Sequence, residues 1–201
     1  MKLGIFGGTF DPPHIGHINA FKSFIQQFNF DEAHIIPVNM PPHKNLHSST
    51  SANDRMEMAR LAFEDLSSKV VVSNIEILRE GKSYTADTIR YYIENGFDDI
   101  YFLCGTDMFL TLDMWYKPEY IFEHATIVFA RREADLSITE EIEKKSKEYV
   151  KKYNAKIVPL NAKLVEISST EIRRSIKNGD SSLLTPKVEK YILDKGLYND
   201  G

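Results

Sequence analysis

The sequence predicts an α/β fold in which helices cover both faces of a doubly wound parallel sheet. Short apolar runs alternate with amphipathic segments of about 10 to 15 residues, the pattern of consecutive βαβ units. Turns rich in Gly, Ser and Thr follow several of these runs, where a sheet of this kind binds its ligands. The chain has 201 residues, enough to bury about 70% of the surface that it exposes when unfolded. We therefore expect a single domain spanning residues 1–201.

The first predicted unit is a strand followed by a helix. The run KLGIFGG at residues 2–8 is apolar and ends in two glycines. The segment 15–28 then has apolar residues at helical spacing, namely Ile15, Ile18, Phe21, Ile25 and Phe28. This unit places a Gly-Gly turn and a helix start directly after a buried strand.

The alternation continues along the rest of the chain. Apolar runs predict strands at 33–38, 70–77, 100–105, 126–132, 156–160 and 164–167. Periodic segments predict helices at 51–66, 85–96 with Gly96 as the C-terminal stop, 138–153, 168–179 and 186–196. The polar segment NMPPHKNLHSST at 39–50 is predicted as a long loop, and long loops in compact domains are usually functional or mobile.

Composition excludes several classes of protein. Lys and Arg total 25 against 29 Asp and Glu, so the net charge of -4 argues against a broad basic surface for nucleic acid. No apolar stretch reaches the ~20 residues of a membrane span, and the N-terminus does not resemble a signal peptide. The single cysteine, Cys104, lies in a predicted strand and is expected to be an inert core thiol. We expect a cytoplasmic protein, in which an anionic small ligand would need a locally positive pocket; whether it forms a homo-oligomer is left open.

The stretch GGTFDPPHIGH offers the first candidate site. Gly7 and Gly8 let the backbone approach a ligand closely, and the following helix start presents N–H groups to phosphate. His14 and His17 are three residues apart, so both can lie on one helix face and donate to polyphosphate oxygens. The alternatives are a pair of capping or core histidines, or a metal pair, although the spacing differs from that of metalloproteases and we expect no metal site. Neither a dinucleotide fingerprint nor a P-loop is present.

The stretch ISSTEIRRS at 167–175 offers a second candidate site. Ser168 and Glu171 have the spacing of a capping box, which alone could explain them. Hydroxyls from Ser168, Ser169 and Thr170, together with the Arg173 guanidinium, would also form a phosphate site facing the histidines.

Two further turns bear on a second, planar substrate. SYTADT at 83–88 and GTD at 105–107, followed by WYKP at 115–118, come after predicted strands. Thr85 has an alternative role as a helix N-cap, and Trp115 as a core residue. Together the two turns would give helix N–H groups and an indole ring for a planar anion.

These motifs resemble those of a known family. GGTFDPPHIGH and ISSTEIR are similar to the two signatures of the nucleotidyltransferase superfamily, which has a Rossmann-like fold and a HxGH element shared with class I aminoacyl-tRNA synthetases. The elements PPHK (41–44), SYTADT, GTD with WYKP, and YILDKGLY (191–198) resemble the bacterial nicotinate-nucleotide adenylyltransferases, in the family's order along nearly the whole chain. Two departures are mild: Thr9 stands where serine is common, and Met114 where the family often has His or Thr.

The resemblance implies transfer of AMP from ATP to nicotinate mononucleotide, giving deamido-NAD and pyrophosphate. The implied catalytic residues are His14, His17, Lys44 and Arg173. Thr85, Trp115 and Tyr116 would bind the pyridine nucleotide. The implied ATP site comprises Gly7, Gly8, Thr9, Phe10, His14, His17, Gly105, Asp107, Ser168, Thr170 and Arg173.

The residue inventory suits this chemistry. The attacking phosphate oxygen is already anionic, so no general base is required, and positioning with charge stabilisation supplies the catalysis. Mg²⁺ can be held mainly by the phosphates and water.

Two alternative functions remain. A phosphopantetheine adenylyltransferase usually has Thr where His14 stands and lacks PPHK and SYTADT, and a non-catalytic nucleotide sensor would be expected to lose a signature histidine.

Overall fold

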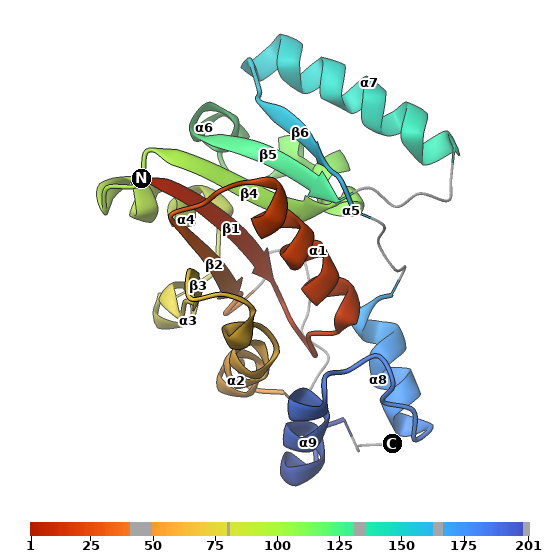
Figure 1. Cartoon of the computed structure of the whole chain (residues 1–201). Coiled ribbons are helices and arrows are strands. Elements are labelled where there is room, and N and C mark those ends of the chain that lie inside the picture. Colours follow the sequence, from red (N-terminus) through yellow and green to blue (C-terminus); the bar gives the residue numbers. More distant parts are fainter. Residues whose placement is uncertain (41–49, 80, 131–135, 163–166, 199–201) are drawn as a thin grey trace.

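The protein is a six-stranded parallel sheet flanked by helices on both faces (Figure 1). The computed structural model describes residues 1–40, 50–79, 81–130, 136–162 and 167–198. The strands are β1 (Lys2–Gly8), β2 (Glu32–Pro37), β3 (Val70–Val72), β4 (Asp99–Gly105), β5 (Ala125–Ala130) and β6 (Ile157–Leu160). The helices are α1 (Ile15–Gln27), α2 (Ala52–Phe63), α3 (Ile75–Leu78), α4 (Thr85–Glu94), α5 (Thr106–Leu110), α6 (Pro118–His124), α7 (Leu136–Tyr153), α8 (Ser169–Lys177) and α9 (Pro186–Lys195). Two short 3₁₀ segments, Glu64–Leu66 and Leu112–Met114, complete the described elements.

The strand order confirms the doubly wound prediction. It is β3-β2-β1-β4-β5-β6, with every neighbouring pair parallel. The chain therefore builds outward from β1 in one direction and from β4 in the other, so the order reverses between these two strands. Ligands of such sheets bind beyond the carboxyl ends of the strands at this reversal. Phe6 pairs with Leu103 in the register of β1 and β4, which brings the Gly8 and Gly105 ends to the same edge.

Alternation along β1 divides the core between the two faces of the sheet. Leu3 and Ile5 belong to a cluster with residues of α4 to α7, whereas Phe6 belongs to a cluster with α1, α2, α8 and α9. Gly4 faces the second of these, where a Cβ atom would lie 2.8 Å from the rings of Phe24 and Phe30. A larger residue at this position would force the rings of Phe24 and Phe30 to shift.

The predicted strand 70–77 is wrong in its second half. Only Val70–Val72 pair with β2, and Ile75–Leu78 form the short helix α3. The helical turn directs the Glu76 carboxylate inward, where the Thr88 hydroxyl donates to it over 2.6 Å. A period of two and a single helical turn cannot be told apart over so few apolar residues. The predicted strand 164–167 lies outside the described residues except for Ile167, which is not in a strand.

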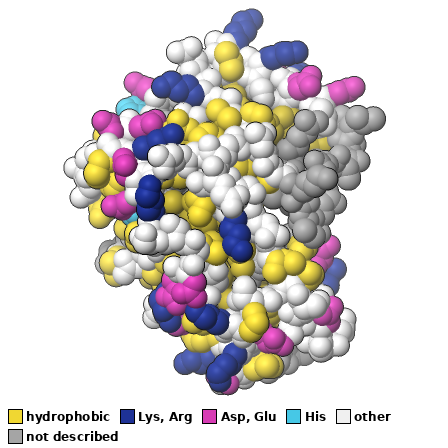
Figure 2. Space-filling model, in the orientation of Figure 1, with side chains coloured by type: hydrophobic (Ala, Val, Ile, Leu, Met, Phe, Trp, Pro, Cys, Tyr) yellow, Lys and Arg dark blue, Asp and Glu magenta, His cyan; other side chains and the backbone are white. Residues whose placement is uncertain are grey.

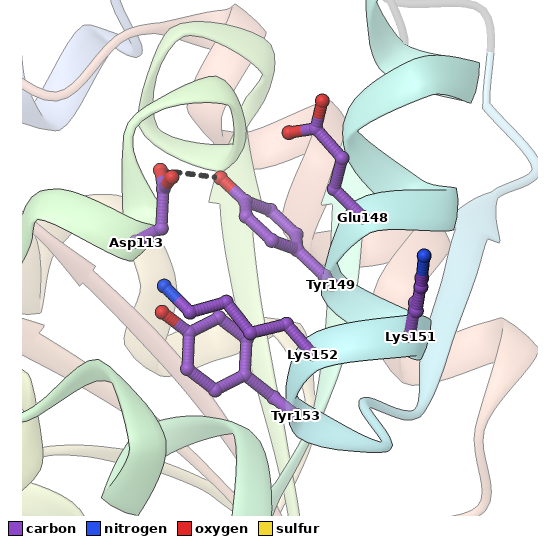
Figure 3. A pocket seen from close by; sticks show the side chains of 6 residues that line it. All are labelled: Asp113, Glu148, Tyr149, Lys151, Lys152 and Tyr153. Atoms are coloured by element: carbon purple, nitrogen blue, oxygen red, sulfur yellow. Dashed lines mark hydrogen bonds between the residues drawn. The ribbon is translucent and has the colours of Figure 1, made fainter.

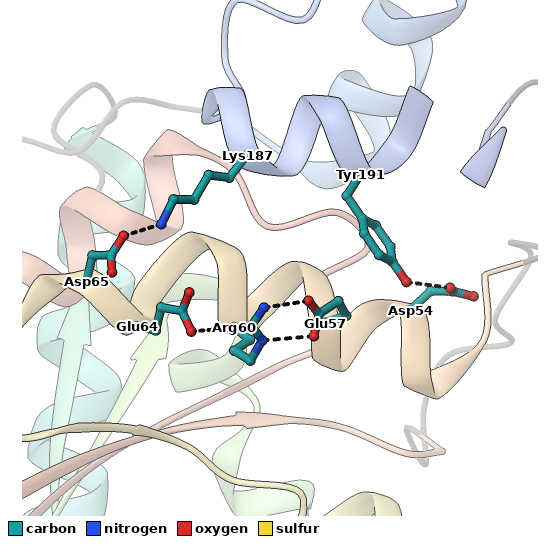
Figure 4. Close-up of polar contacts among 7 residues, drawn as sticks. All are labelled: Asp54, Glu57, Arg60, Glu64, Asp65, Lys187 and Tyr191. Carbon is teal, nitrogen blue, oxygen red and sulfur yellow. Dashed lines mark hydrogen bonds and ion pairs between the residues drawn. The ribbon is translucent and has the colours of Figure 1, made fainter. Parts of the chain in front are cut away.

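Helices α8 and α9 lie together beyond the carboxyl ends of β1 and β2, and α9 packs on α2 (Figure 1). Helix α9 has Thr185 as N-cap and ends at Gly196, whose φ of 62° suits glycine. Two polar contacts join α9 to the α2 region: the Tyr191 hydroxyl donates to Asp54 Oδ1 over 2.9 Å, and Lys187 pairs with Asp65 (Figure 4). This packing brings the C-terminal residues next to the end of β1.

The surface and the lone thiol agree with the composition. In the view of Figure 2, Lys and Arg side chains are interspersed with Asp and Glu over the described part of the face, without a continuous basic area. Within the described ranges, no helix combines the length and apolar character needed to cross a membrane.

Cys104 is fully buried in β4, and burial raises the pKa of its thiol far above the ordinary value. Its expected role as an inert core thiol is confirmed.

Candidate active site

The two histidines lie against each other where β1 leads into α1. His14 is the N-cap of α1, and the centroids of the His14 and His17 rings are 3.7 Å apart. His17 Nδ1 accepts a hydrogen bond from the His14 backbone N–H over 3.3 Å. The histidines therefore do cap the helix, as one alternative held. The same arrangement places both rings at the first turn of α1, beside its positive dipole end.

Burial keeps the His14 ring neutral. Only 3% of the residue is exposed, and the loss of water lowers the pKa of His14 to about 4, against the opposing field of Glu171. Its Nδ1 atom is buried without a hydrogen-bond partner in the described part of the chain. An unmatched buried nitrogen costs free energy that a ligand can recover. Among the described residues, His14 is thus a polar side chain whose hydrogen bonding is incomplete.

The loop between the Gly-Gly turn and His14 has little steric freedom. Phe10 has a left-handed backbone with φ of 50°, and its ring is buried. A Cβ atom on Gly8 would lie 2.9 Å from that ring, whereas one on Gly7 would meet only ordinary contacts at 3.9 Å. Glycine is therefore required at position 8. The Phe10 ring also packs edge-on against His17, with 5.3 Å between the ring centroids, and this contact restrains the imidazole.

Helix α8 meets this loop directly. The Ser169 hydroxyl donates to the Pro12 carbonyl over 3.0 Å, and Arg173 Nη1 donates to the Asp11 carbonyl over 2.6 Å. Arg173 Nη2 also donates to the Thr170 hydroxyl over 3.1 Å. The two predicted phosphate-binding stretches therefore lie side by side although about 160 residues separate them in sequence. The guanidinium has five N–H donors, so these contacts do not exhaust it.

The predicted capping box of α8 is confirmed. The Ser168 hydroxyl accepts from the Glu171 backbone N–H over 3.2 Å, while Glu171 Oε2 accepts from the Ser168 N–H over 2.7 Å. The geometry is therefore compatible with both interpretations of the stretch, a capping box and a phosphate site. Its first residues cap α8, and that end of α8 contacts the histidine loop. A direct role of Ser168 in phosphate binding stays a prediction.

Sequence reasoning missed Arg55, whose guanidinium donates to carbonyls at the ends of β1 and β2. This residue of α2 is 1% exposed, and Nη1 donates to the carbonyls of Thr9 and Val38 over 3.1 and 2.5 Å. Nη2 donates to the Asn39 carbonyl over 3.0 Å. The guanidinium thereby ties the end of β1 to the end of β2. The signal was available, because Arg55 stands on the same helix face as the buried residues Met58, Ala59 and Ala62.

The GTD element lies at the end of β4, on the other side of the strand-order reversal. Gly105 is the N-cap of α5, and Asp107 is an exposed residue of its first turn. A Cβ atom on Gly105 would meet nothing within 4 Å, so the glycine leaves open space at this edge. Gly105 and Asp107 thus lie where ATP is predicted to bind, next to the end of β1.

The predicted pyridine site is built from two segments that contact each other through aromatic rings. Helix α4 begins at Thr85 with Tyr84 as its N-cap, so Thr85 is the first helical residue and not the cap. The rings of Tyr84 and Tyr116 are 4.6 Å apart between centroids. Trp115 is half-buried, with its ring edge-on to Phe102 of β4 at 6.3 Å. Tyr84, which sequence reasoning did not single out, therefore links the two turns.

A buried carboxyl stands behind this helix start. Glu76 is 6% exposed and accepts from Thr88, whose hydroxyl in turn accepts from Arg79 Nη1 over 3.2 Å. Burial raises the pKa of Glu76 above its ordinary value. The Ser83 hydroxyl accepts from the Asn39 N–H over 3.2 Å, which joins α4 to the end of β2. These contacts were not predicted, since their partners are distant in sequence.

Three further observations concern Lys44, metal binding and a hollow away from the site. Lys44 lies outside the described residues. Among the residues that the structure describes, no group of three or more His, Cys, Asp or Glu side chains is placed to hold a metal ion. A separate open hollow of about 450 Å³ lies against the C-terminal half of α7, where Tyr149 donates to Asp113 Oδ1 over 3.0 Å (Figure 3). None of the predicted ATP-binding residues lines it.

The fold and the two predicted phosphate-binding stretches that it brings together define a nucleotidyltransferase-type α/β protein, and comparison with known proteins agrees. The family model described as cytidylyltransferase-like matches residues 5–175. A Caldicellulosiruptor saccharolyticus protein is 35% identical over the whole of both chains, and a Clostridium botulinum protein is 38% identical over 98% of this chain and 99% of its own; both are named "Probable nicotinate-nucleotide adenylyltransferase".

Solved structures show the same fold. A Plasmodium falciparum nicotinic acid mononucleotide adenylyltransferase complexed with NaAD superposes with a TM-score of 0.74 at 20% identity, covering 100% of this chain and 98% of that one. With the full-length relatives above, the particular assignment follows: the chain belongs to the nicotinate-nucleotide adenylyltransferase family of enzymes.

Proposed function

We propose that the protein transfers the adenylyl group of ATP to nicotinate mononucleotide, forming deamido-NAD and releasing pyrophosphate. The observation that carries this proposal is the meeting of the His14/His17 loop with Arg173 of α8 at the carboxyl end of β1. Two imidazoles, a guanidinium and a helix start converge there, as a polyphosphate requires. The names of the full-length relatives support the same substrate pair.

The reaction needs no protein nucleophile. A phosphate oxygen of the mononucleotide forms a bond to the α-phosphorus of ATP, while the bond from that phosphorus to the bridging oxygen of the β-phosphate breaks. Negative charge builds up on the α-phosphoryl oxygens and on the leaving pyrophosphate. We assign its stabilisation to His17, His14 and Arg173, with Lys44 as a further cation. Catalysis then consists of holding two polyanions in line.

Mg²⁺ enters this scheme with ATP. The described side chains include no cluster for a metal ion, whereas phosphate oxygens and water satisfy the octahedral preference of Mg²⁺. When bound, the ion would neutralise part of the phosphate charge. Cytoplasmic action on small molecules, without nucleic acid, remains part of this proposal and is supported by the net charge of -4.

The helix start at Thr85 supports the acid as substrate over the amide. Helix N–H groups attract the nicotinate carboxylate, and Trp115 and Tyr116 offer rings beside it. A neutral amide would place its NH₂ group against donors, and two unmatched contacts cost about 1 to 3 kcal/mol each. The expected preference for the acid is about 10² or more in kcat/KM.

The test measures kcat/KM for nicotinate and nicotinamide mononucleotide with ATP on one enzyme preparation, with Trp115→Ala alongside. A clear preference for the acid supports the carboxylate site at Thr85. Equal values would mean that this helix start does not distinguish the carboxylate. Turnover of 4′-phosphopantetheine instead of either mononucleotide would overturn the proposed function itself.

A further inference from the structure

The C-terminal part of the chain contacts the histidine loop at several points, in addition to the Arg55 donor at Thr9 described above. Ser169 and Arg173 donate to the carbonyls of Pro12 and Asp11, as described above. The Ile15 backbone N–H donates to the Leu183 carbonyl over 3.0 Å. These contacts use backbone atoms of the loop, so they restrain its path without depending on its side chains.

The C-terminal part of the chain also contacts the Asp11 side chain of the loop. The Tyr198 hydroxyl donates to Asp11 Oδ1 over 2.6 Å, across 187 residues of sequence, and both residues are buried. Arg173 Nη1 lies 3.9 Å from the other carboxylate oxygen, Oδ2. Asp11 is therefore shared between the phosphate-binding helix α8 and the residue that follows α9.

The backbone on both sides of this contact is strained. Tyr198 has φ of 65° and Phe10, the neighbour of Asp11, has φ of 50°; both values lie in the left-handed region. Such a conformation costs a residue with a Cβ atom roughly 1–2 kcal/mol and persists only where the surroundings enforce it. Left-handed backbone at Tyr198 and at the residue before Asp11 indicates that the Asp11–Tyr198 contact constrains the loop as well as filling space in the core.

We propose that Tyr198 is a positioning residue for ATP, which acts through Asp11 to hold the 9–14 loop in the conformation that presents His14 and His17 to the phosphates. The inference rests on the proposed function for the identity of the nucleotide. It assigns to the C-terminal segment a role in substrate binding that its distance from the histidines in sequence does not suggest. Loss of the hydroxyl should therefore weaken ATP binding specifically, because the pyridine site at Thr85 and Trp115 is built from other segments.

The chain offers a matched control. Tyr191 on α9 also donates its hydroxyl to an aspartate, Asp54 Oδ1, over 2.9 Å (Figure 4). That contact fastens α9 to α2 at the capping box of α2 and does not involve the loop. Tyr191→Phe and Tyr198→Phe each remove one C-terminal hydroxyl that donates to an aspartate, from a part-buried contact at Tyr191 and a buried contact at Tyr198.

The experiment measures KM for each substrate, kcat, and the dissociation constant of ATP alone by calorimetry, with thermal unfolding of each variant. For Tyr198→Phe we expect the KM and dissociation constant of ATP to rise about five- to tenfold, the scale of one partly transmitted hydrogen bond to a charged group. The KM of nicotinate mononucleotide should stay within about twofold of that of the wild type. Tyr191→Phe should leave both substrate constants unchanged. The melting temperatures of the two variants show how much general stability each change removes.

Unchanged ATP binding in a folded Tyr198→Phe variant would overturn the inference. So would equal effects of the two variants on ATP, because the hydroxyl would then act only through general stability. Combining Tyr198→Phe with Asp11→Ala should add little to the effect of Asp11→Ala alone, and full additivity would likewise contradict the proposal. A wild-type enzyme inactive on nicotinate mononucleotide would refute the proposed function, yet the ATP dissociation constants would still decide the role of Tyr198.

Discussion

The buried His14 imidazole makes a testable contribution to the pH dependence of folding. Its pKa is about 4 in the folded protein, against the ordinary value of 6.5 expected for the unfolded chain, because burial disfavours the charged ring. Below pH 6.5 the unfolded chain binds a proton at this site and the folded chain does not. Stability from His14 is therefore fully present above about pH 6.5 and is lost as the pH falls toward about 4.

The magnitude follows from the two pKa values. At pH 4.5 the unfolded ring is almost fully protonated while the folded ring is still mostly neutral. With about 1.4 kcal/mol for each pKa unit, the free energy of unfolding falls by roughly 2 to 3 kcal/mol between pH 7 and pH 4.5 from this group alone.

Urea denaturation of the wild type and of His14→Gln, at a series of pH values without phosphate, measures this contribution. Glutamine does not titrate, so the variant should lose about 2 to 3 kcal/mol less than the wild type across the window. His34, whose pKa is also lowered by burial, remains in both proteins and cancels in the comparison. Parallel pH profiles for the two proteins would show that His14 is not held neutral, and the account of its burial would fail.

Three other predictions concern the phosphate site and its support. His17→Ala should lower kcat by about 10² or more while the fold persists, since it removes a donor for developing charge; near-normal turnover in a folded variant would remove His17 from the mechanism. Lys44→Ala should raise the KM for ATP or lower kcat in steady-state assays, and if neither changes, the 39–50 loop has another role. Arg55→Met should lower the free energy of unfolding by about 3 kcal/mol or more in urea titrations, because three carbonyls at the ends of β1 and β2 lose their donor; unfolding at the wild-type urea concentration would refute this account of Arg55.

Periodicity and motifs were sufficient to predict the fold. The apolar runs located every described strand to within one or two residues, except that 70–77 contains a strand of three residues followed by α3. An edge strand this short carries too few residues to establish a period. The short helices α5 and α6 were not predicted, because segments of five and seven residues carry little periodic signal.

The candidate site could be predicted only where residues close in sequence form a motif with a recognisable chemical role. The histidine loop and the ISSTEIR stretch each predict a helix start with side chains suited to phosphate, and the structure brings the two stretches together. Arg55, Glu76 and Tyr198 act through partners between 12 and 187 residues away, and no spacing rule relates such pairs. Tertiary contacts of this kind are decided by the packing of whole elements, which a single sequence does not display.

The single tryptophan and the single cysteine make the protein well suited to fluorescence measurements. Trp115 is the only indole in the sequence and lies half-buried at the predicted pyridine site, so intrinsic fluorescence comes from a single emitter beside the second substrate. Cys104 is sealed in the sheet and will not compete for thiol-reactive dyes. A cysteine introduced at Leu193, which is 67% exposed on α9, can therefore be labelled selectively. Energy transfer from the indole to that dye then measures whether the distance between Trp115 and α9 changes when substrates bind.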